Sequence, residues 1–349
     1  MKWTKKRLNN LFLLIGIVAV VVMLFTFEVS FVELWQHICH AGYWLIPIIG
    51  IWLVVYAMNA LAWRTIVHSP AVGHARVSFL RMLKLTITGY ALNYATPVGG
   101  LGGEPYRILE LSKDIGNRRA TSSVILYVMM HFFSHFWLWF LSIFIYLALA
   151  HRGLVPLTPM LKILLAITTA VCLLAFYLFM RGYRKGMVFN TIRTLAHIPF
   201  LTRWCIRFLR RRGHTLRTID AEIAALHQHD RRAFYASLLL EFFSRVVQGF
   251  EVMFMLLLFD IDFGGGTSGL ALTFVVSVLI VAITSLLANI LGFLPMQLGV
   301  QEGGFVVSIA LLGFAPSLGI FVCIICRVRE IIWIALGLAL MRIGEKHPS

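Results

Sequence analysis

The chain of 349 residues has few charged side chains, and acidic ones are the scarcer kind. Asp, Glu, Lys and Arg together make up 13% of it, about half the share in a soluble domain, whereas hydrophobic residues make up 60%. The mean hydropathy is +0.85. This composition excludes an ordinary soluble globular protein, a disordered chain, a coiled coil and a collagen-like chain. The apolar residues form long unbroken runs rather than short alternating segments, which favours a helical membrane protein over a β-barrel.

Cysteine is scarce as well, and the common signatures of catalysis are missing. The five cysteines include one CxxC pair, which lies inside an apolar run and has no second pair nearby, so we expect helix packing rather than metal or redox chemistry. We find no Walker A loop, no GxSxG elbow and no multiple histidine box. We therefore expect no enzyme activity, no cofactor and no ATP-driven transport by this chain alone. The cysteines are Cys39, Cys172, Cys205, Cys323 and Cys326.

Apolar runs long enough to cross a hydrocarbon core of about 30 Å recur along the chain. Two further apolar regions, 80–111 and 270–314, are interrupted by proline and glycine. Basic residues precede the first run as in a signal peptide, but no small-x-small cleavage site follows, so we expect an uncleaved anchor. The uninterrupted runs are 11–27, 41–63, 121–150, 157–180, 233–259 and 317–341.

The net charge is +16, and the basic residues lie between the apolar runs. This placement indicates a role in membrane topology or in contact with anionic lipid rather than binding of nucleic acid. The distribution of Lys and Arg predicts cytoplasmic N- and C-termini, in a bacterial inner membrane. It also returns region 80–106 to the cytoplasmic side and 270–314 to the outside, as two re-entrant hairpins; eight full crossings are the alternative. Segment 181–232 has twelve Lys or Arg and is expected to be a cytoplasmic loop, either lying on the anionic leaflet as an amphipathic helix or serving topology alone.

An internal repeat accompanies the two interrupted regions. The first reads PVGGLGGE over 97–104 and the second PMQLGVQE over 295–302, with proline and glutamate seven apart in both. The offset between them is 302 − 104 = 198 residues, and it superimposes the neighbouring apolar runs, whose predicted directions are opposite. We therefore predict an all-α polytopic membrane protein, one integral membrane domain over 1–349, built as an inverted repeat of 8–150 and 157–341 with about six full spans and two broken hairpins.

The broken segments are candidates for binding. Irregular backbone at membrane depth survives only inside protein or beside a wet cavity, and glycine-rich helix N-termini favour anions such as phosphate. Glu104 and Glu302 lie at the expected hairpin tips, where each is predicted to carry a proton or to pair with a cation. Arg107 follows Glu104 and either holds phosphate or pairs with it. The glycines of the expected phosphate nest are Gly99, Gly100, Gly102 and Gly103, with Gly299 in the second hairpin; a close-packed turn without ligand is the alternative.

Other charged residues fall inside the predicted spans. Glu241 and Arg245 are four apart in one span, and Arg327, Arg329 and Glu330 lie in the last one. Charges at this depth normally face the interior of a bundle, so they predict either a polar cavity or a structural network of ion pairs. His131 and His135 are also four apart, but HFFSH lacks the glutamate of HExxH, so we expect them to line the cavity rather than to bind a metal.

These features together resemble one family, the transmembrane region of lysylphosphatidylglycerol synthetases, also called flippase-like domain proteins. The resemblance rests on PVGGLGGEPYR (97–107), LPMQLGVQEGG (294–304) and the layout of the spans, and it extends over about 8–341. In the second motif Met296 and Gln297 stand where the family usually has glycine. The positions that match the family motifs are Pro97, Gly102, Glu104 and Arg107 in the first and Pro295, Gly299 and Glu302 in the second.

The resemblance implies movement of a lipid across the membrane. In bifunctional relatives this region moves aminoacylated phosphatidylglycerol to the outer leaflet after a separate domain has made it; stand-alone members are associated with hopanoids and polyprenyl-linked glycans. No synthetase domain is found here, so lipid aminoacylation is not expected. We expect a phosphate-bearing head group, of an anionic phospholipid or a polyprenyl-linked lipid, to enter between the hairpins. The alternatives are an ion-coupled transporter of a soluble anion, an enzyme acting on lipid-linked sugars, and a partner of a lipid or glycan synthase.

Overall fold

The computed structural model describes residues 39, 41–70, 76–95, 102–185, 230–261, 263, 266–290 and 300–342, together with isolated positions between 193 and 224. Every regular element among these residues is helical, which confirms the predicted all-α class. The predicted first span, 11–27, lies outside the described residues, as does most of the basic loop. The helices are η1 (Gly42–Trp44), α3 (Leu45–Val67), α4 (Phe79–Ala95), α5 (Glu104–Ile115), α6 (Asn117–His151), α7 (Pro159–Lys185), α10 (Arg231–Leu258), α11 (Gly266–Ile290), α12 (Val300–Leu311) and α13 (Pro316–Arg342).

Four stretches in the described part of the chain are long and apolar enough to cross a membrane. Three of them correspond to predicted spans. The fourth is α11, which belongs to the second interrupted region and has 25 residues. The first interrupted region also forms two helices, α4 and α5, that flank the glycine-rich motif. The four stretches are Gly42–Val67, Asn117–His151, Leu161–Arg181 and Gly266–Ile290.

The helices α10 and α13 are as long as the apolar ones but are interrupted by charge. They have 28 and 27 residues, which corresponds to about 40 Å of helix each. Each has three charged side chains near its middle, and all six are buried. These helices therefore turn their charges into the bundle, as expected of charged residues at membrane depth. The six residues are Glu241, Arg245 and Glu251 in α10, and Arg327, Arg329 and Glu330 in α13.

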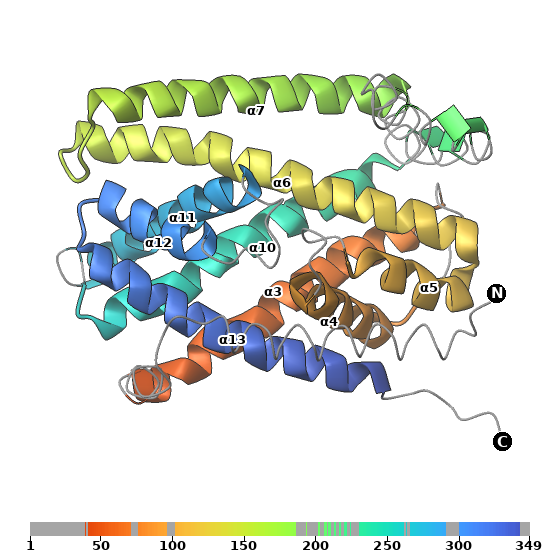
Figure 1. Cartoon of the computed structure of the whole chain (residues 1–349), viewed down its shortest axis with the longest axis horizontal. Coiled ribbons are helices and arrows are strands. Elements are labelled where there is room, and N and C mark those ends of the chain that lie inside the picture. The colour runs from red at the N-terminus through yellow and green to blue at the C-terminus, as the bar shows by residue number, and fades with distance from the viewer. Residues whose placement is uncertain are drawn as a thin grey trace.

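The order of helices is the same on both sides of α7. A long helix, a broken pair and a second long helix occur as α3, α4–α5 and α6, and again as α10, α11–α12 and α13. Helices α5 and α12 both have 12 residues, and a shift of 198 brings one within two residues of the other. The two sets interlock, since α3 packs along α10, α4 against α13, and α11 against α6 (Figure 1). The repeat boundaries 8–150 and 157–341 stay predictions.

Proline and glycine decide where several helices begin and end. Pro105 occupies the first turn of α5, where its missing N–H leaves no hydrogen bond unmade. Gly116 separates α5 from α6 with φ of 83°, a conformation that glycine adopts without steric cost. Pro159 and Pro316 are the first residues of α7 and α13. The chain thus breaks where such residues occur, and α5 follows the motif directly.

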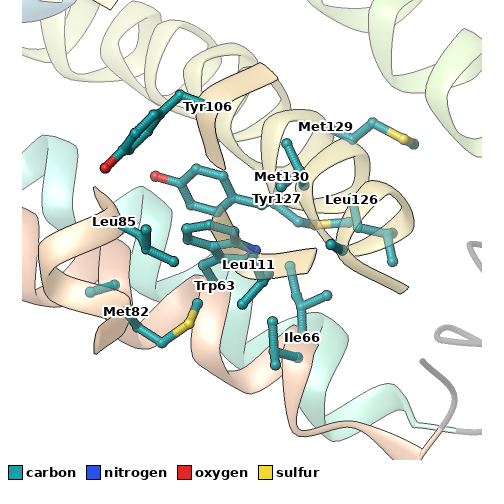
Figure 2. Packing of buried hydrophobic residues seen from close by; sticks show 14 of the residues in the cluster. Trp63, Ile66, Met82, Leu85, Tyr106, Leu111, Leu126, Tyr127, Met129 and Met130 are labelled. Atoms are coloured by element: carbon teal, nitrogen blue, oxygen red, sulfur yellow. The ribbon is translucent and has the colours of Figure 1, made fainter. Parts of the chain in front are cut away.

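Buried aromatic rings join the first broken pair to the long helices. Trp63 of α3 and Tyr127 of α6 stack with ring centres 5.5 Å apart. Figure 2 shows these two rings between Leu85 and Met82 of α4 on one side and the α6 residues on the other. This packing holds α3, α4, α5 and α6 together beneath the first hairpin tip.

Candidate functional site

A cavity of about 250 Å³ lies where the broken helices end. It is lined from the C-terminal end of α4 and the N-terminal end of α5, and from the same two ends of α11 and α12. The remaining lining comes from the middles of the long helices, for example Asn59 of α3, Arg245 of α10 and Arg329 of α13. The C-terminal ends of α4 and α11 and the N-terminal ends of α5 and α12 therefore lie halfway along the helices that surround them. Although α11 is long enough to cross a membrane, its C-terminal end lies in this cavity.

At the first tip, Glu104 is held by a residue of its own helix. Arg107 Nη1 donates to Glu104 Oε1 at 2.7 Å, and Asn93 Nδ2 of α4 donates to the same oxygen at 3.3 Å. Asn93 also accepts the N–H of Gly103 at 2.6 Å through its Oδ1. Asn93 thus fastens the end of α4 to the start of α5. The N–H of Gly103 is occupied by this bond and is not available to a phosphate.

The guanidinium of Arg107 is enclosed by aromatic rings. Its carbon lies 4.7 Å from the ring centre of Tyr90, 5.2 Å from that of Tyr127 and 5.8 Å from that of Trp63. Such rings attract a cation through their negative faces. Gly89 lies against the side chain, and a Cβ there would overlap Arg107; likewise a Cβ on Gly103 would overlap the backbone of Gly89. The absence of side chains at these two glycines lets α4 and α5 approach and seats the arginine between them.

At the second tip, Glu302 is held by a residue of another helix. Arg327 of α13 donates to Glu302 Oε1 from Nη2 at 2.8 Å and from Nε at 3.0 Å. The same guanidinium donates to Glu330 Oε2 at 2.8 Å, and Gln301 donates to Glu330 Oε1 at 2.9 Å. One buried arginine therefore joins the start of α12 to the middle of α13.

A second ion pair joins α10 to α13, and a tryptophan of α3 contacts both of its members. Arg329 Nε donates to Glu251 Oε1 at 2.8 Å, and Trp52 Nε1 donates to Glu251 Oε2 at 2.7 Å. The guanidinium carbon of Arg329 lies 3.8 Å from the ring centre of Trp52. All three side chains line the cavity. Arg329 Nη1 is buried and has no hydrogen bond to the described residues.

The third cluster contains Glu241, which is fully buried. His131 Nδ1 lies 2.8 Å from Glu241 Oε2, and Asn59 Nδ2 donates to Oε1 at 3.1 Å. The expected partner, Arg245, is 3.9 Å away and instead donates to Ser134 Oγ at 2.6 Å and to the backbone oxygen of His131 at 2.7 Å. The helical spacing of Glu241 and Arg245 thus puts both in one cluster, but their shortest bonds are to other residues.

The predicted site residues divide between the cavity and its supports. Glu104, Arg107, Arg245 and Arg329 line the cavity together with His131 and His135, as predicted for the histidines. Glu241, Glu302 and Arg327 are not among the lining residues; Glu241 and Arg327 are buried, whereas the side chain of Glu302 is 38% exposed. Gly102 and Gly103 immediately precede α5. The remaining predicted glycines, Gly99, Gly100 and Gly299, lie outside the described residues, as do Pro97 and Pro295.

Several polar lining residues escaped the sequence analysis. Asn59, Asn93, Tyr90, Tyr94 and Trp52 all line the cavity. An asparagine within an apolar run is a usable signal, because an amide at membrane depth needs partners. The aromatic residues give no such signal, since apolar helices contain many of them in any role.

Only two of the lining residues are exposed, and they mark where the cavity reaches the surface. Phe132 is 42% exposed and lies near the middle of α6, and Asn289 lies at the C-terminal end of α11. Phe132 therefore places one opening of the cavity on a helix that is long and apolar enough to cross a membrane.

The fold and the site define a polytopic helical membrane protein whose broken helices meet at a polar cavity. The chain belongs to the family described as the lysylphosphatidylglycerol synthase TM region, because the family model matches residues 12–337. A search of curated proteins found no match. A search of solved structures found no match either.

Proposed function

We propose that the protein moves a phosphate-bearing lipid, or a lipid-linked group, from one leaflet of the membrane to the other. The family supports a membrane role of the flippase kind. The observation that carries the proposal is the position of the cavity, which is lined by Arg107, Arg245 and Arg329 and has the exposed Phe132 near the middle of the apolar helix α6. A head group enters there while its hydrocarbon tails stay in the bilayer.

In this proposal the basic and the acidic residues of the lining bind different parts of the head group. Arg107, Arg245 and Arg329 are the donors for the phosphate, since guanidinium groups bind phosphate in a planar, bidentate manner. Glu104 receives a cationic group or a proton, and its Oε2 is buried without a partner among the described residues. Alternating access would come from rocking of one set of helices against the other, as in transporters built from inverted repeats.

The setting of the protein is part of the proposal. We place it in the inner membrane of a bacterium, with both termini in the cytoplasm, on the distribution of Lys and Arg. Its partners are anionic phospholipids or polyprenyl-linked lipids, and a lipid or glycan synthase that supplies them. We propose transport without chemical conversion of the lipid, so the protein is not an enzyme. A soluble anion is the alternative substrate, and we favour a lipid because one exposed lining residue, Phe132, lies near the middle of the apolar helix α6.

The test is transbilayer movement in liposomes containing the purified protein. Labelled phosphatidylglycerol, its lysyl derivative and a polyprenyl phosphate are followed with wild type, Glu104→Gln and Glu110→Gln. Glu110 is the matched control, because it lies on the same helix but pairs with Arg81 and Lys113 away from the cavity. We expect movement of at least one lipid, lost in Glu104→Gln and kept in Glu110→Gln. Movement of no lipid by folded wild type, with uptake of a soluble anion instead, would overturn the proposal.

A further inference from the structure

The charges around the cavity do not balance. Among the described residues, each of three guanidiniums lies within 2.8 Å of a carboxylate, whereas the fourth, Arg245, comes no closer than 3.9 Å. Counted over the part of the chain that the structure describes, this cluster has five carboxylates against four guanidiniums, which leaves one negative charge in excess. An uncompensated charge at membrane depth is costly, so this network has a place for one proton. The acids are Glu104, Glu241, Glu251, Glu302 and Glu330, and the bases are Arg107, Arg245, Arg327 and Arg329.

Glu241 is the acid with the weakest cationic partner. It is fully buried, and the one guanidinium within 4.0 Å of it among the described residues, that of Arg245, bonds elsewhere. Glu302, by contrast, is 38% exposed and has Arg327 at 2.8 Å. In the described part of the chain, His131 is the one histidine that bonds to any of the five carboxylates. The excess charge is therefore best neutralised at His131 and Glu241.

Both hydrogen bonds that the ring of His131 makes to described residues are at Nδ1. Because Nδ1 faces a carboxylate that only accepts, Nδ1 holds a hydrogen when Glu241 is ionised. The opposite nitrogen, Nε2, makes no hydrogen bond to the described residues, and the side chain is 25% exposed where it lines the cavity. A proton arriving from the cavity is thus received by the lone pair of Nε2. The hydrogen between Nδ1 and Oε2 then serves both partners, and the pair titrates as one unit.

We propose that His131 and Glu241 form a proton-binding site that is loaded from the cavity through Nε2. We further propose that uptake and release of this proton drive lipid movement; this second part rests on the proposed function. On loading, a hydronium ion in the cavity gives its proton to the lone pair of Nε2, so one O–H bond breaks as one N–H bond forms. On release to the other side, that N–H bond breaks and a water molecule becomes hydronium, with no change of oxidation state. Glu241 stays buried throughout and acts through His131 as its counter-charge.

The groups around the pair are consistent with a single exchangeable proton. The phenols of Tyr90 and Tyr127 lie 3.1 Å apart, and Tyr90 also lies 3.1 Å from His131 Nδ1. The polar groups that α3 and α11 contribute to the lining are all neutral: Trp52, Asn59, Thr284, Ser285 and Asn289. The titratable and charged groups that face the cavity are Tyr90 and Tyr94 of α4, Glu104 and Arg107 of α5, Tyr127 and His135 of α6, Arg245 and Glu251 of α10, and Arg329 of α13. Arg107 is already paired with Glu104, which leaves Arg245 as the cation nearest the pair.

The first test observes the proton directly, without any lipid transport. Full-length protein labelled with ¹⁵N-histidine is placed in lipid nanodiscs, and the Nε2 signal of His131 is followed by nuclear magnetic resonance between about pH 5 and pH 9, the range in which histidines titrate. The signal is assigned by its loss in His131→Gln or, if that variant does not fold, by its displacement in Tyr90→Phe. We expect Nε2 to become protonated within this range. In Glu241→Gln we expect the midpoint of the His131 titration to fall by about 1–3 pH units, because the carboxylate that favours the charged ring is gone.

The second test asks whether the proton is coupled to lipid movement. Liposomes containing a pH dye receive an imposed pH gradient, and movement of labelled phosphatidylglycerol is measured with wild type, His131→Gln and His151→Gln. His151 is the matched control, because it lies on the same helix, is exposed at its C-terminal end and is not among the residues that line the cavity. We expect the gradient to accelerate lipid movement several-fold in wild type and in His151→Gln, with dye-reported proton flux, and to have no effect in His131→Gln.

The outcomes separate the two proposals. If Nε2 of His131 does not titrate, or if Glu241→Gln leaves its midpoint unchanged, the proton site is wrong whatever the lipid result. If Nε2 titrates but His131→Gln still responds to the gradient, the coupling role is wrong. If wild type moves no lipid at any pH while Nε2 titrates as expected, the proposed function fails and the proton site stands.

Discussion

The two hairpin tips present the same residue, glutamate, and hold it in different ways. Glu104 is bound by Arg107 three residues later in its own helix, whereas Glu302 is bound by Arg327 from α13. The position that corresponds to Arg107 under the 198-residue offset is Phe305. The first tip is thus a local unit, seated on aromatic rings and two glycines, and the second is part of an interface between helices. Glu104 lines the cavity, whereas Glu302 does not line it and is 38% exposed elsewhere.

The largest difference between the two hairpins is expected when the arginine that holds each glutamate is replaced. Arg327 satisfies two carboxylates and Arg107 satisfies one, so we expect Arg327→Met to be the more damaging change. Removing one partner of a buried pair costs about 3–5 kcal/mol, and we expect Arg327→Met to lie in this range and to loosen α12 from α13. Thermal unfolding in detergent, with wild type and Arg107→Met in parallel, measures the difference. Equal losses in the two variants would show that the tips do not differ in this way.

Glycines of the two hairpins test how closely the helices approach. A Cβ on Gly103 would overlap the backbone oxygen of Gly89, whereas a Cβ on Gly303 of α12 meets nothing within 4 Å. We expect Gly103→Ala to destabilise the protein by about 1–3 kcal/mol through overpacking. Gly303→Ala is expected to be neutral or to stabilise by up to about 1 kcal/mol, because alanine favours a helix. The unfolding midpoints of the pair give the answer, and a harmless Gly103→Ala would contradict the close approach.

The two glutamates are expected to differ in their effect on transport, because Glu104 lines the cavity and Glu302 does not. We expect Glu104→Gln to slow movement of labelled phosphatidylglycerol by about tenfold or more, since a hydrogen bond to a charged group contributes about 1.5–3 kcal/mol. Glu302→Gln is expected to lower stability more than rate, because Glu302 does not line the cavity. Initial rates in liposomes, normalised to folded protein, compare the two. A larger rate loss in Glu302→Gln would reverse the assignment.

The smallest expected effect concerns two buried threonines that the offset of 198 makes equivalent. Thr284 of α11 shares a hydrogen bond of 2.9 Å with Ser308 of α12, whereas Thr86 Oγ1 of α4 has no partner in the described residues. We expect Thr284→Val to cost about 1 kcal/mol, the usual value of one hydrogen bond. Thr86→Val is expected to be neutral or stabilising, since it removes an unsatisfied hydroxyl at constant shape. Equal midpoints for the two variants would contradict this difference.

Much of the fold follows from patterns that are local in the chain. Length and hydropathy predict the long helices, and Pro and Gly predict where the broken regions begin and end. The pairing of acids with arginines does not follow in the same way. Glu104 and Arg107 are one helical turn apart, so their contact is predictable, whereas Glu251 and Arg329 are 78 residues apart and meet only through the packing of α10 on its neighbours.

Helical spacing was also insufficient within a single helix. Glu241 and Arg245 have the favourable order for a pair four residues apart, yet each finds shorter bonds to α3 or α6. Asn59, His131 and Ser134 supply those bonds, and none of them is near α10 in the chain. In a buried site, the closest partner is decided by the facing helix rather than by the next turn.

The sequence by itself determined that this is a membrane protein of many helices, with two broken regions and charges that must face inward, because each of these properties depends on composition or on neighbours a few residues away. Only the tertiary structure decided which acid meets which base and that both broken regions have helix ends at one cavity. It also decided that Glu241 makes its shortest bond to His131 rather than to Arg245. These depend on helices distant in the chain being packed together, and the cost of an unpaired charge at membrane depth makes that packing decisive.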